Sequence, residues 1–122
     1  MELTKIREGN TRLLVYKSER VSAKLPVFYN PRMEINRNLT VCAVSVFKKN
    51  YAKPLKFCDA LAASGAMGLR VAKEALRAED EVILNDKSPR AVELIKKNAE
   101  LNALENFPST QEAPPCKLAL LS

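Results

Sequence analysis

The feature that most constrains this chain is a strand, a glycine-containing loop and a helix, followed by a second strand and a second helix. Lys56–Leu61 is predicted to be a short buried strand, and the loop Ala62–Gly68 leads into an Ala/Leu/Val-rich helix ending near Arg77. Glu81–Asn85 is the second strand, and Ser88-Pro89 predicts the start of the next helix. Such alternation indicates a parallel sheet with right-handed crossovers, so the fold class is α/β.

A hairpin and a helix are predicted before this unit. Apolar residues flank Glu8-Gly9-Asn10, a sequence typical of a short hairpin loop. Asn30-Pro31 predicts a helix start, and Lys48-Lys49 a helix end. Between them, apolar residues at helical spacing predict one apolar face, made of Ile35, Leu39, Cys42 and Val46. The expected organisation is a basic N-terminal part (1–53), a βαβα unit (54–106) and an irregular, non-native tail (107–122), in which 118–121 could form a short strand.

Composition excludes several classes of protein. With 122 residues, 47% of them hydrophobic, the chain is long enough for one core, and no apolar stretch is long enough to cross a bilayer. The absence of histidine excludes His bases and His–Cys zinc sites within the chain, so no metal is expected. Three widely spaced cysteines favour a reducing compartment, and we expect a cytoplasmic monomer. Cys42 and Cys58 are predicted to be buried.

The charge is unevenly distributed along the sequence. Residues 1–57 carry a net charge of +8, and residues 58–122 a net charge of −2. A basic segment of this kind is suited to phosphate contacts, with Lys48 and Lys49 as candidates, although a solvated surface without a partner explains the same charges.

The candidate chemistry lies at the first strand–helix junction. Ser64 and Gly65 belong to a loop in which glycines let the backbone approach a ligand. Asp86 follows Gly65 by 21 residues, at the end of the next strand, where a carboxylate can accept hydrogen bonds from ribose hydroxyls. Asp59, before the loop, would repel a pyrophosphate but could accept from a cationic aminoacyl group. These residues therefore favour S-adenosylmethionine over a dinucleotide.

Longer segments resemble a known family. Val27–Met33 running on to Asn36-Arg37, then Asp59–Gly65 with Gly68-Leu69-Arg70, then Leu84-Asn85-Asp86, resemble the tRNA guanine-N2 dimethyltransferases, and the opening residues resemble archaeal members. These enzymes methylate the exocyclic amine of the guanine at tRNA position twenty-six. The resemblance implies a class I, Rossmann-like methyltransferase fold, here incomplete, with S-adenosylmethionine as methyl donor and tRNA as substrate.

The resemblance also implies roles for individual residues. Arg37, Arg70 and Asp86 match positions that hold the cofactor, the arginines at its carboxylate or near the adenosine and Asp86 at the ribose. Phe28 matches an aromatic that stacks on the flipped guanine. From the sequence alone, Phe28 would be interpreted as a core aromatic and Arg37 as a surface charge.

The sequence also departs from that family. Its catalytic Asp-Pro turn does not occur here, since no Asp precedes a proline, and so no catalytic residue is assigned. Family members are several times longer. We therefore expect an N-terminal part of a tRNA methyltransferase that is inactive alone. Two alternatives remain open: a non-catalytic basic RNA-binding fragment, and a fragment of a dinucleotide-binding oxidoreductase.

Overall fold

The computed structural model describes residues 2–16, 25–104 and 116–121. In chain order these residues form β1 (Leu3–Glu8), β2 (Thr11–Tyr16), the short 3-10 helix η1 (Pro31–Met33), α1 (Glu34–Lys49), β3 (Lys56–Asp59), α2 (Ala66–Glu74), β4 (Glu81–Asn85), α3 (Pro89–Leu101) and β5 (Lys117–Leu121). The predicted hairpin is confirmed: β1 and β2 pair antiparallel around a two-residue turn at Gly9 and Asn10.

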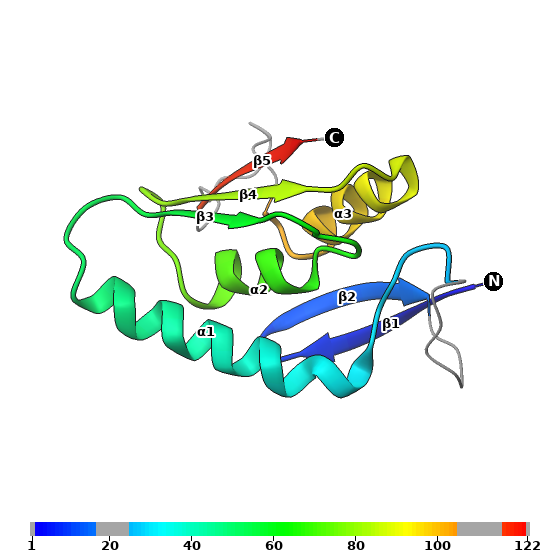
Figure 1. The fold of residues 1–122 in the computed structure, drawn as a ribbon, viewed down its shortest axis with the longest axis horizontal. Helices are drawn as coiled ribbons and strands as arrows, with labels where there is room; N and C mark the ends of the chain where they lie inside the picture. The colour runs from blue at the N-terminus through cyan, green and yellow to red at the C-terminus, as the bar shows by residue number, and fades with distance from the viewer. Residues whose placement is uncertain (1, 17–24, 105–115, 122) are drawn as a thin grey trace.

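A parallel sheet of order β3-β4-β5 confirms the predicted α/β class (Figure 1). Ser88 caps α3 as expected, because its hydroxyl accepts from the Ala91 amide. The short strand expected at 118–121 is present: residues 117–121 form β5 and pair with β4 from Glu81 to Asn85. Residues 107–115 lie outside the described part of the chain. The apolar run 118–121 was the only sign of this third strand in the sequence.

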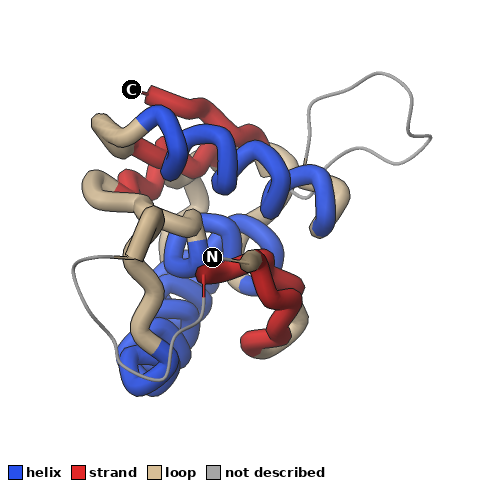
Figure 2. The backbone as a smooth tube through the Cα atoms, turned by 90° about the vertical axis from the view of Figure 1, so that its right-hand side faces the viewer, coloured by secondary structure: helices blue, strands red, loops and turns tan. Residues whose placement is uncertain are grey.

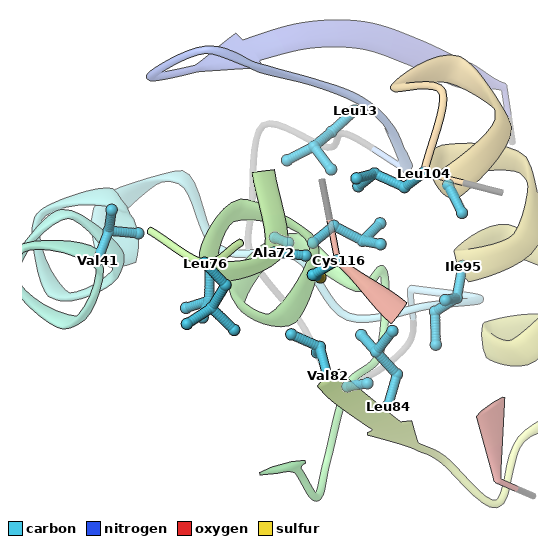
Figure 3. Packing of buried hydrophobic residues seen from close by; sticks show 14 of the residues in the cluster. Leu13, Val41, Ala72, Leu76, Val82, Leu84, Ile95, Leu104 and Cys116 are labelled. Atoms are coloured by element: carbon cyan, nitrogen blue, oxygen red, sulfur yellow. The ribbon is translucent and has the colours of Figure 1, made fainter. Parts of the chain in front are cut away.

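The core lies on one side of this sheet, where the helices and the hairpin pack (Figures 1 and 2). Val82 and Leu84 of β4 are fully buried and belong to the same core cluster as residues of α2 and the hairpin (Figure 3). The opposite face of the strands carries the row Cys58, Ile83 and Ala119, which are paired in register and belong to no core cluster among the described residues.

Two asparagines of α3 join the hairpin to this core. The Asn98 amide accepts from the Leu14 N–H at 2.7 Å and donates to the Leu14 carbonyl at 3.0 Å. Asn102, one turn later, makes the same pair of bonds to Arg12. The two side chains thus provide hydrogen-bond partners for the N–H and carbonyl groups on the outer edge of β2, as a neighbouring strand would. The basic N-terminal half and the βαβα unit consequently share one core.

The apolar face of α1 does not pack against that core. Ile35, Leu39 and Val46 are 64%, 65% and 60% exposed, while the buried residues of this helix are Arg37, Val41 and Lys48. The predicted burial of Cys42 and Cys58 was wrong, since both are exposed. Lys48 pairs with buried Asp80, so the expectation that its ammonium meets phosphate was also wrong.

Candidate functional site

A cleft of about 220 Å³ opens where β3 ends and α2 begins, beside the start of α1. It collects four of the residues predicted from the sequence, namely Phe28, Arg37, Asp59 and Ser64. The remaining lining comes from the same two segments of the chain: Tyr29, Asn30, Met33, Asn36, Leu61, Ala62, Ala63, Ala66 and Met67. Gly65, Arg70 and Asp86 do not line it.

The loop that lines this cleft between β3 and α2 depends on two glycines. Gly65 adopts φ +84°, a left-handed conformation that glycine favours, and it caps the N-terminus of α2. Gly68 permits close packing, because a Cβ there would lie 2.5 Å from Cδ2 of Leu84 and 3.2 Å from the Asp59 side chain. Glycine 68 thus lets the first turn of α2 approach the ends of β3 and β4.

The side chain of Asp86 supports the loop by accepting a hydrogen bond from the loop backbone. One carboxylate oxygen accepts from the Ala63 N–H at 2.9 Å, and the other accepts from the Ser88 N–H at 2.9 Å. Ala63 itself has φ +49°, an uncommon conformation for a residue with a side chain. Asp86 therefore fixes Ala63, a strained residue that lines the cleft. It also holds Ser88, the residue that caps the N-terminus of α3.

Asp59 is the carboxylate of the cleft lining. Its Oδ2 accepts from the Gly68 N–H at 3.0 Å. Burial raises the pKa of Asp59, and the charge of Asp86 raises it further, against the lowering effect of the Gly68 hydrogen bond. A cationic ligand group would relieve this unfavourable environment.

Phe28 stands out from its neighbours on either side. Val27 and Tyr29 are 4% and 6% exposed, whereas Phe28 is 46% exposed and lines the cleft. The sequence alone favoured a core aromatic at this position, and that interpretation was wrong. An exposed ring at the edge of a cleft is available for stacking on a planar ligand.

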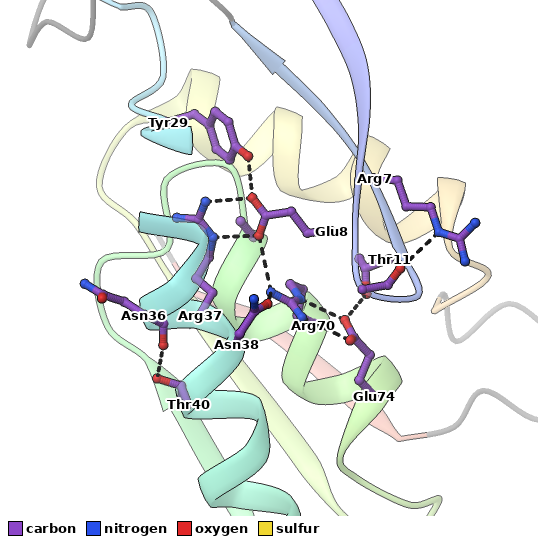
Figure 4. Close-up of polar contacts among 12 residues, drawn as sticks. Arg7, Glu8, Thr11, Tyr29, Asn36, Arg37, Asn38, Thr40, Arg70 and Glu74 are labelled. Atoms are coloured by element: carbon purple, nitrogen blue, oxygen red, sulfur yellow. Dashed lines mark hydrogen bonds and ion pairs between the residues drawn. The ribbon is translucent and has the colours of Figure 1, made fainter. Parts of the chain in front are cut away.

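Arg37 is buried and fixed by a carboxylate from the hairpin (Figure 4). Its Nε and Nη2 donate to the two oxygens of Glu8 at 2.7 and 2.6 Å, and Nη2 also donates to the Asn30 carbonyl at 3.1 Å. The Tyr29 hydroxyl donates to the same carboxylate, and the guanidinium carbon lies 5.0 Å from the Tyr29 ring centroid. The interpretation of Arg37 as a surface charge was therefore wrong.

Arg70 belongs to the same polar network but does not line the cleft. Its Nε and Nη2 donate to Glu74 at 2.8 and 3.1 Å, and Nη1 donates to Asn38 at 2.7 Å and to Glu8 at 3.4 Å. Every guanidinium nitrogen of Arg70 thus has a protein partner.

Sequence reasoning missed three members of this site. Glu8 was assigned only to the hairpin turn, and Tyr29 and Asn36 were quoted only as part of a motif. A buried glutamate in a basic segment was not recognisable, because its partners are 29 and 62 residues away. The dense F-Y-N-P…N-R segment was the available signal for the other two.

Comparison with known proteins decides the family. Residues 8–116 match the profile of the family described as N2,N2-dimethylguanosine tRNA methyltransferase. The chain belongs to this family.

Individual tRNA methyltransferase relatives agree with that assignment. The tRNA (guanine(26)-N(2))-dimethyltransferase of Methanopyrus kandleri is 46% identical over 107 residues, which are 87% of this chain and 26% of the relative. The Sulfurisphaera tokodaii protein of the same name is 44% identical over 120 residues, 93% of this chain and 30% of the relative. The chain thus spans roughly a quarter to a third of the relatives' length.

Solved structures establish the fold. Trm1 from Pyrococcus horikoshii, in complex with S-adenosyl-L-methionine, matches with a TM-score of 0.67 and 37% identity over 88% of this chain and 25% of that one. A SAM-dependent methyltransferase from Agrobacterium tumefaciens, at 20% identity, matches with a TM-score of 0.65 over 98% of this chain and 32% of that one. The fold is that of a class I, Rossmann-like methyltransferase, incomplete in this chain.

Two further observations concern the described residues of this family member. They contain no group of three or more acidic or cysteine side chains placed to hold a metal ion. None of their helices combines the length and the apolar character needed to span a bilayer.

Proposed function

We propose that this chain forms the S-adenosylmethionine-binding part of a tRNA guanine-N2 methyltransferase. The observation that carries the proposal is the cleft at the glycine loop, which presents the guanidinium of Arg37 and the carboxylate of Asp59 on one small surface. The methionine part of the donor bears a carboxylate and an ammonium, so these two side chains match its two charges.

The same cleft is poorly suited to a dinucleotide. A pyrophosphate needs backbone N–H groups free of competing acceptors, and here the Gly68 N–H already donates to Asp59. The negative charge of Asp59 would also repel phosphate at this position. This disfavours the oxidoreductase alternative.

The remaining residues would position the donor and the base. Asp86 would contribute at the ribose while holding the loop. Ser64 would line the cofactor site, and Gly65 would give the loop the left-handed conformation with which α2 begins. Arg70 would act through Glu8. Phe28 would stack on a guanine taken out of the RNA helix. When bound, the cofactor supplies an electrophilic methyl group, so the protein's task is to orient the acceptor amine and receive its proton.

Calorimetric titration of the chain with S-adenosylhomocysteine, NAD and unmodified tRNA tests the proposal. We expect binding of S-adenosylhomocysteine and no binding of NAD. Arg37→Ala should weaken S-adenosylhomocysteine binding, whereas Arg32→Ala, an exposed arginine five positions earlier, should not. Binding of NAD alone would favour the oxidoreductase, and binding of tRNA alone would favour the RNA-binding fragment.

We further propose that tRNA meets the basic half of the chain, through exposed lysines such as Lys49, Lys53 and Lys56. Reversing the charge of Lys49, as in Lys49→Glu, should make tRNA affinity depend less steeply on salt concentration, since each phosphate contact releases counterions. An unaltered slope would place the contact elsewhere.

Methyl transfer by this chain alone should be slow, because no Asp-Pro turn is present to accept the proton. Cytoplasmic location and a monomeric state stay predictions.

A further inference from the structure

We infer that Glu8 is a positioning residue for the cofactor: it holds Arg37 side-on so that Nη1 of Arg37 is presented to the carboxylate of the methionine moiety. This inference rests on the proposed function. It also assigns the two buried arginines different tasks, Arg37 at the ligand and Arg70 within the protein.

Glu8 and Arg37 form a side-on pair (Figure 4). Both oxygens of Glu8 are used, one by Nε at 2.7 Å and one by Nη2 at 2.6 Å. A side-on pair of this kind fixes the plane of the guanidinium, and its second edge stays free for another acceptor. Among the described residues, no hydrogen bond is made by Nη1 of Arg37, and Arg37 lines the cleft.

Arg70 makes a similar pair but has a partner for its third nitrogen. Glu74 holds Arg70 in the same side-on manner, at 2.8 and 3.1 Å. The third nitrogen of Arg70 is taken by Asn38 at 2.7 Å, and Arg70 does not line the cleft. The two pairs are therefore alike except that Arg37 lines the cleft and its third nitrogen has no partner among the described residues.

Glu8 is a buried carboxylate with several partners. Its side chain is 1% exposed and is shared by Arg37, Arg70 and Tyr29. Burial would raise the pKa of Glu8, but the Arg37 and Tyr29 hydrogen bonds and both guanidinium charges lower it below its usual range. Glu8 is thus ionised at neutral pH and prevents repulsion between two guanidiniums that converge on one of its oxygens.

The test compares two ligands that differ in the methionine moiety. S-adenosylhomocysteine carries the carboxylate, and 5′-methylthioadenosine lacks it. In calorimetric titrations of the full chain, Glu8→Gln should weaken S-adenosylhomocysteine binding by about ten- to a hundredfold, the range for losing an ordered charged hydrogen bond. Binding of 5′-methylthioadenosine should change by less than about twofold, because that ligand does not reach Arg37.

Two further variants keep the outcome decisive. Asp80→Asn removes the charge of a buried carboxylate that pairs with Lys48 and does not line the cleft, and it should leave the ratio of the two affinities unchanged. Glu8→Asp keeps the charge but shortens its reach, so it should lower the ratio even if Glu8→Gln does not fold; circular dichroism reports folding for each variant. Equal weakening of both ligands would show that Glu8 is only structural and overturn the inference alone. Absence of S-adenosylhomocysteine binding by the unaltered chain would overturn the proposed function and this inference with it.

Discussion

The ammonium of Lys48, at the end of α1, lies 2.7 Å from Oδ1 of Asp80, which comes 32 residues later, just before β4. Asp80 is fully buried and also accepts from the Leu55 and Arg77 N–H groups, each at 2.8 Å. One carboxylate therefore joins α1, the approach to β3 and the segment that follows α2.

Removing that charge should destabilise the chain. Asp80→Asn is expected to lower the free energy of unfolding by about 1–3 kcal/mol, because one buried donor loses its acceptor. Glu79→Gln is the matched control, since Glu79 also faces Lys48, at 3.5 Å, but is 48% exposed and should contribute almost nothing. Urea unfolding followed by circular dichroism measures both, and equal effects would contradict the assignment.

Stability should fall in acid. The pKa values of Glu8, Glu74 and Asp80 lie below their usual range: burial raises each, but hydrogen bonds to Arg37, Arg70 and Lys48, respectively, lower it more. Carboxylates with a depressed pKa in the folded state stabilise it fully above the unfolded pKa of about 4, and this stabilisation is lost as pH falls through the folded values. Urea unfolding at a series of pH values between neutrality and strong acid should show that decline. A flat profile would mean that these pairs contribute little.

The close approach at Gly68 can be tested by adding one methyl group. Gly68→Ala should destabilise the chain by about 1–3 kcal/mol, since the new Cβ would lie 2.5 Å from Cδ2 of Leu84. Leu84→Val removes the opposing atoms, so the double variant should lose less stability than the two single variants predict together. If the two losses of stability simply add in thermal unfolding, then the contact between position 68 and Leu84 does not cause the destabilisation by Gly68→Ala.

Two apolar residues of α1 should respond differently to truncation. Val41 is 8% exposed and packs in the main core, whereas Leu39 is 65% exposed. Val41→Ala should cost about 2 kcal/mol of unfolding free energy, and Leu39→Ala less than about 0.5 kcal/mol, although leucine is the larger side chain. The comparison requires only the isolated chain, and a reversed order would place the core on the other side of α1.

Asp86 should affect cofactor affinity even though its oxygens already accept from the protein. Asp86→Ala would release the Ala63 N–H as well as any ribose contact, and S-adenosylhomocysteine binding should weaken by about 1–3 kcal/mol. Lys87→Ala, an exposed neighbour, is the control. An unchanged affinity in a folded Asp86→Ala variant would remove this residue from the site.

Local patterns predicted the local structure well. The hairpin turn, the Ser88 cap and the βαβα order follow from residues within a few positions of one another, and the structure confirms each. α2 ends at Glu74, short of the predicted Arg77, because apolar content alone does not mark where a helix stops.

Pairings over long sequence distances could not be predicted. Arg37 occupies a polar position of α1 in the sequence, and only the folded hairpin brings Glu8 to it. The apolar stripe at Ile35, Leu39 and Val46 misled for the opposite reason: helical spacing shows that a face is apolar but not which surface covers it.

The row Cys58, Ile83 and Ala119, which belongs to no core cluster among the described residues, has a practical consequence, because Cys58 is an exposed thiol. Cys42 lies likewise in the apolar hollow of about 690 Å³ over α1, beside Val46 and Phe47. Burial raises the pKa of Cys116 to about 12, as do the nearby Asp80 and Glu81 charges, so this third thiol stays protonated and inert at neutral pH. A maleimide applied to the native chain would therefore label two positions, one on each uncovered apolar surface. A partner that binds to either surface would lower the rate of maleimide labelling at the cysteine that it covers.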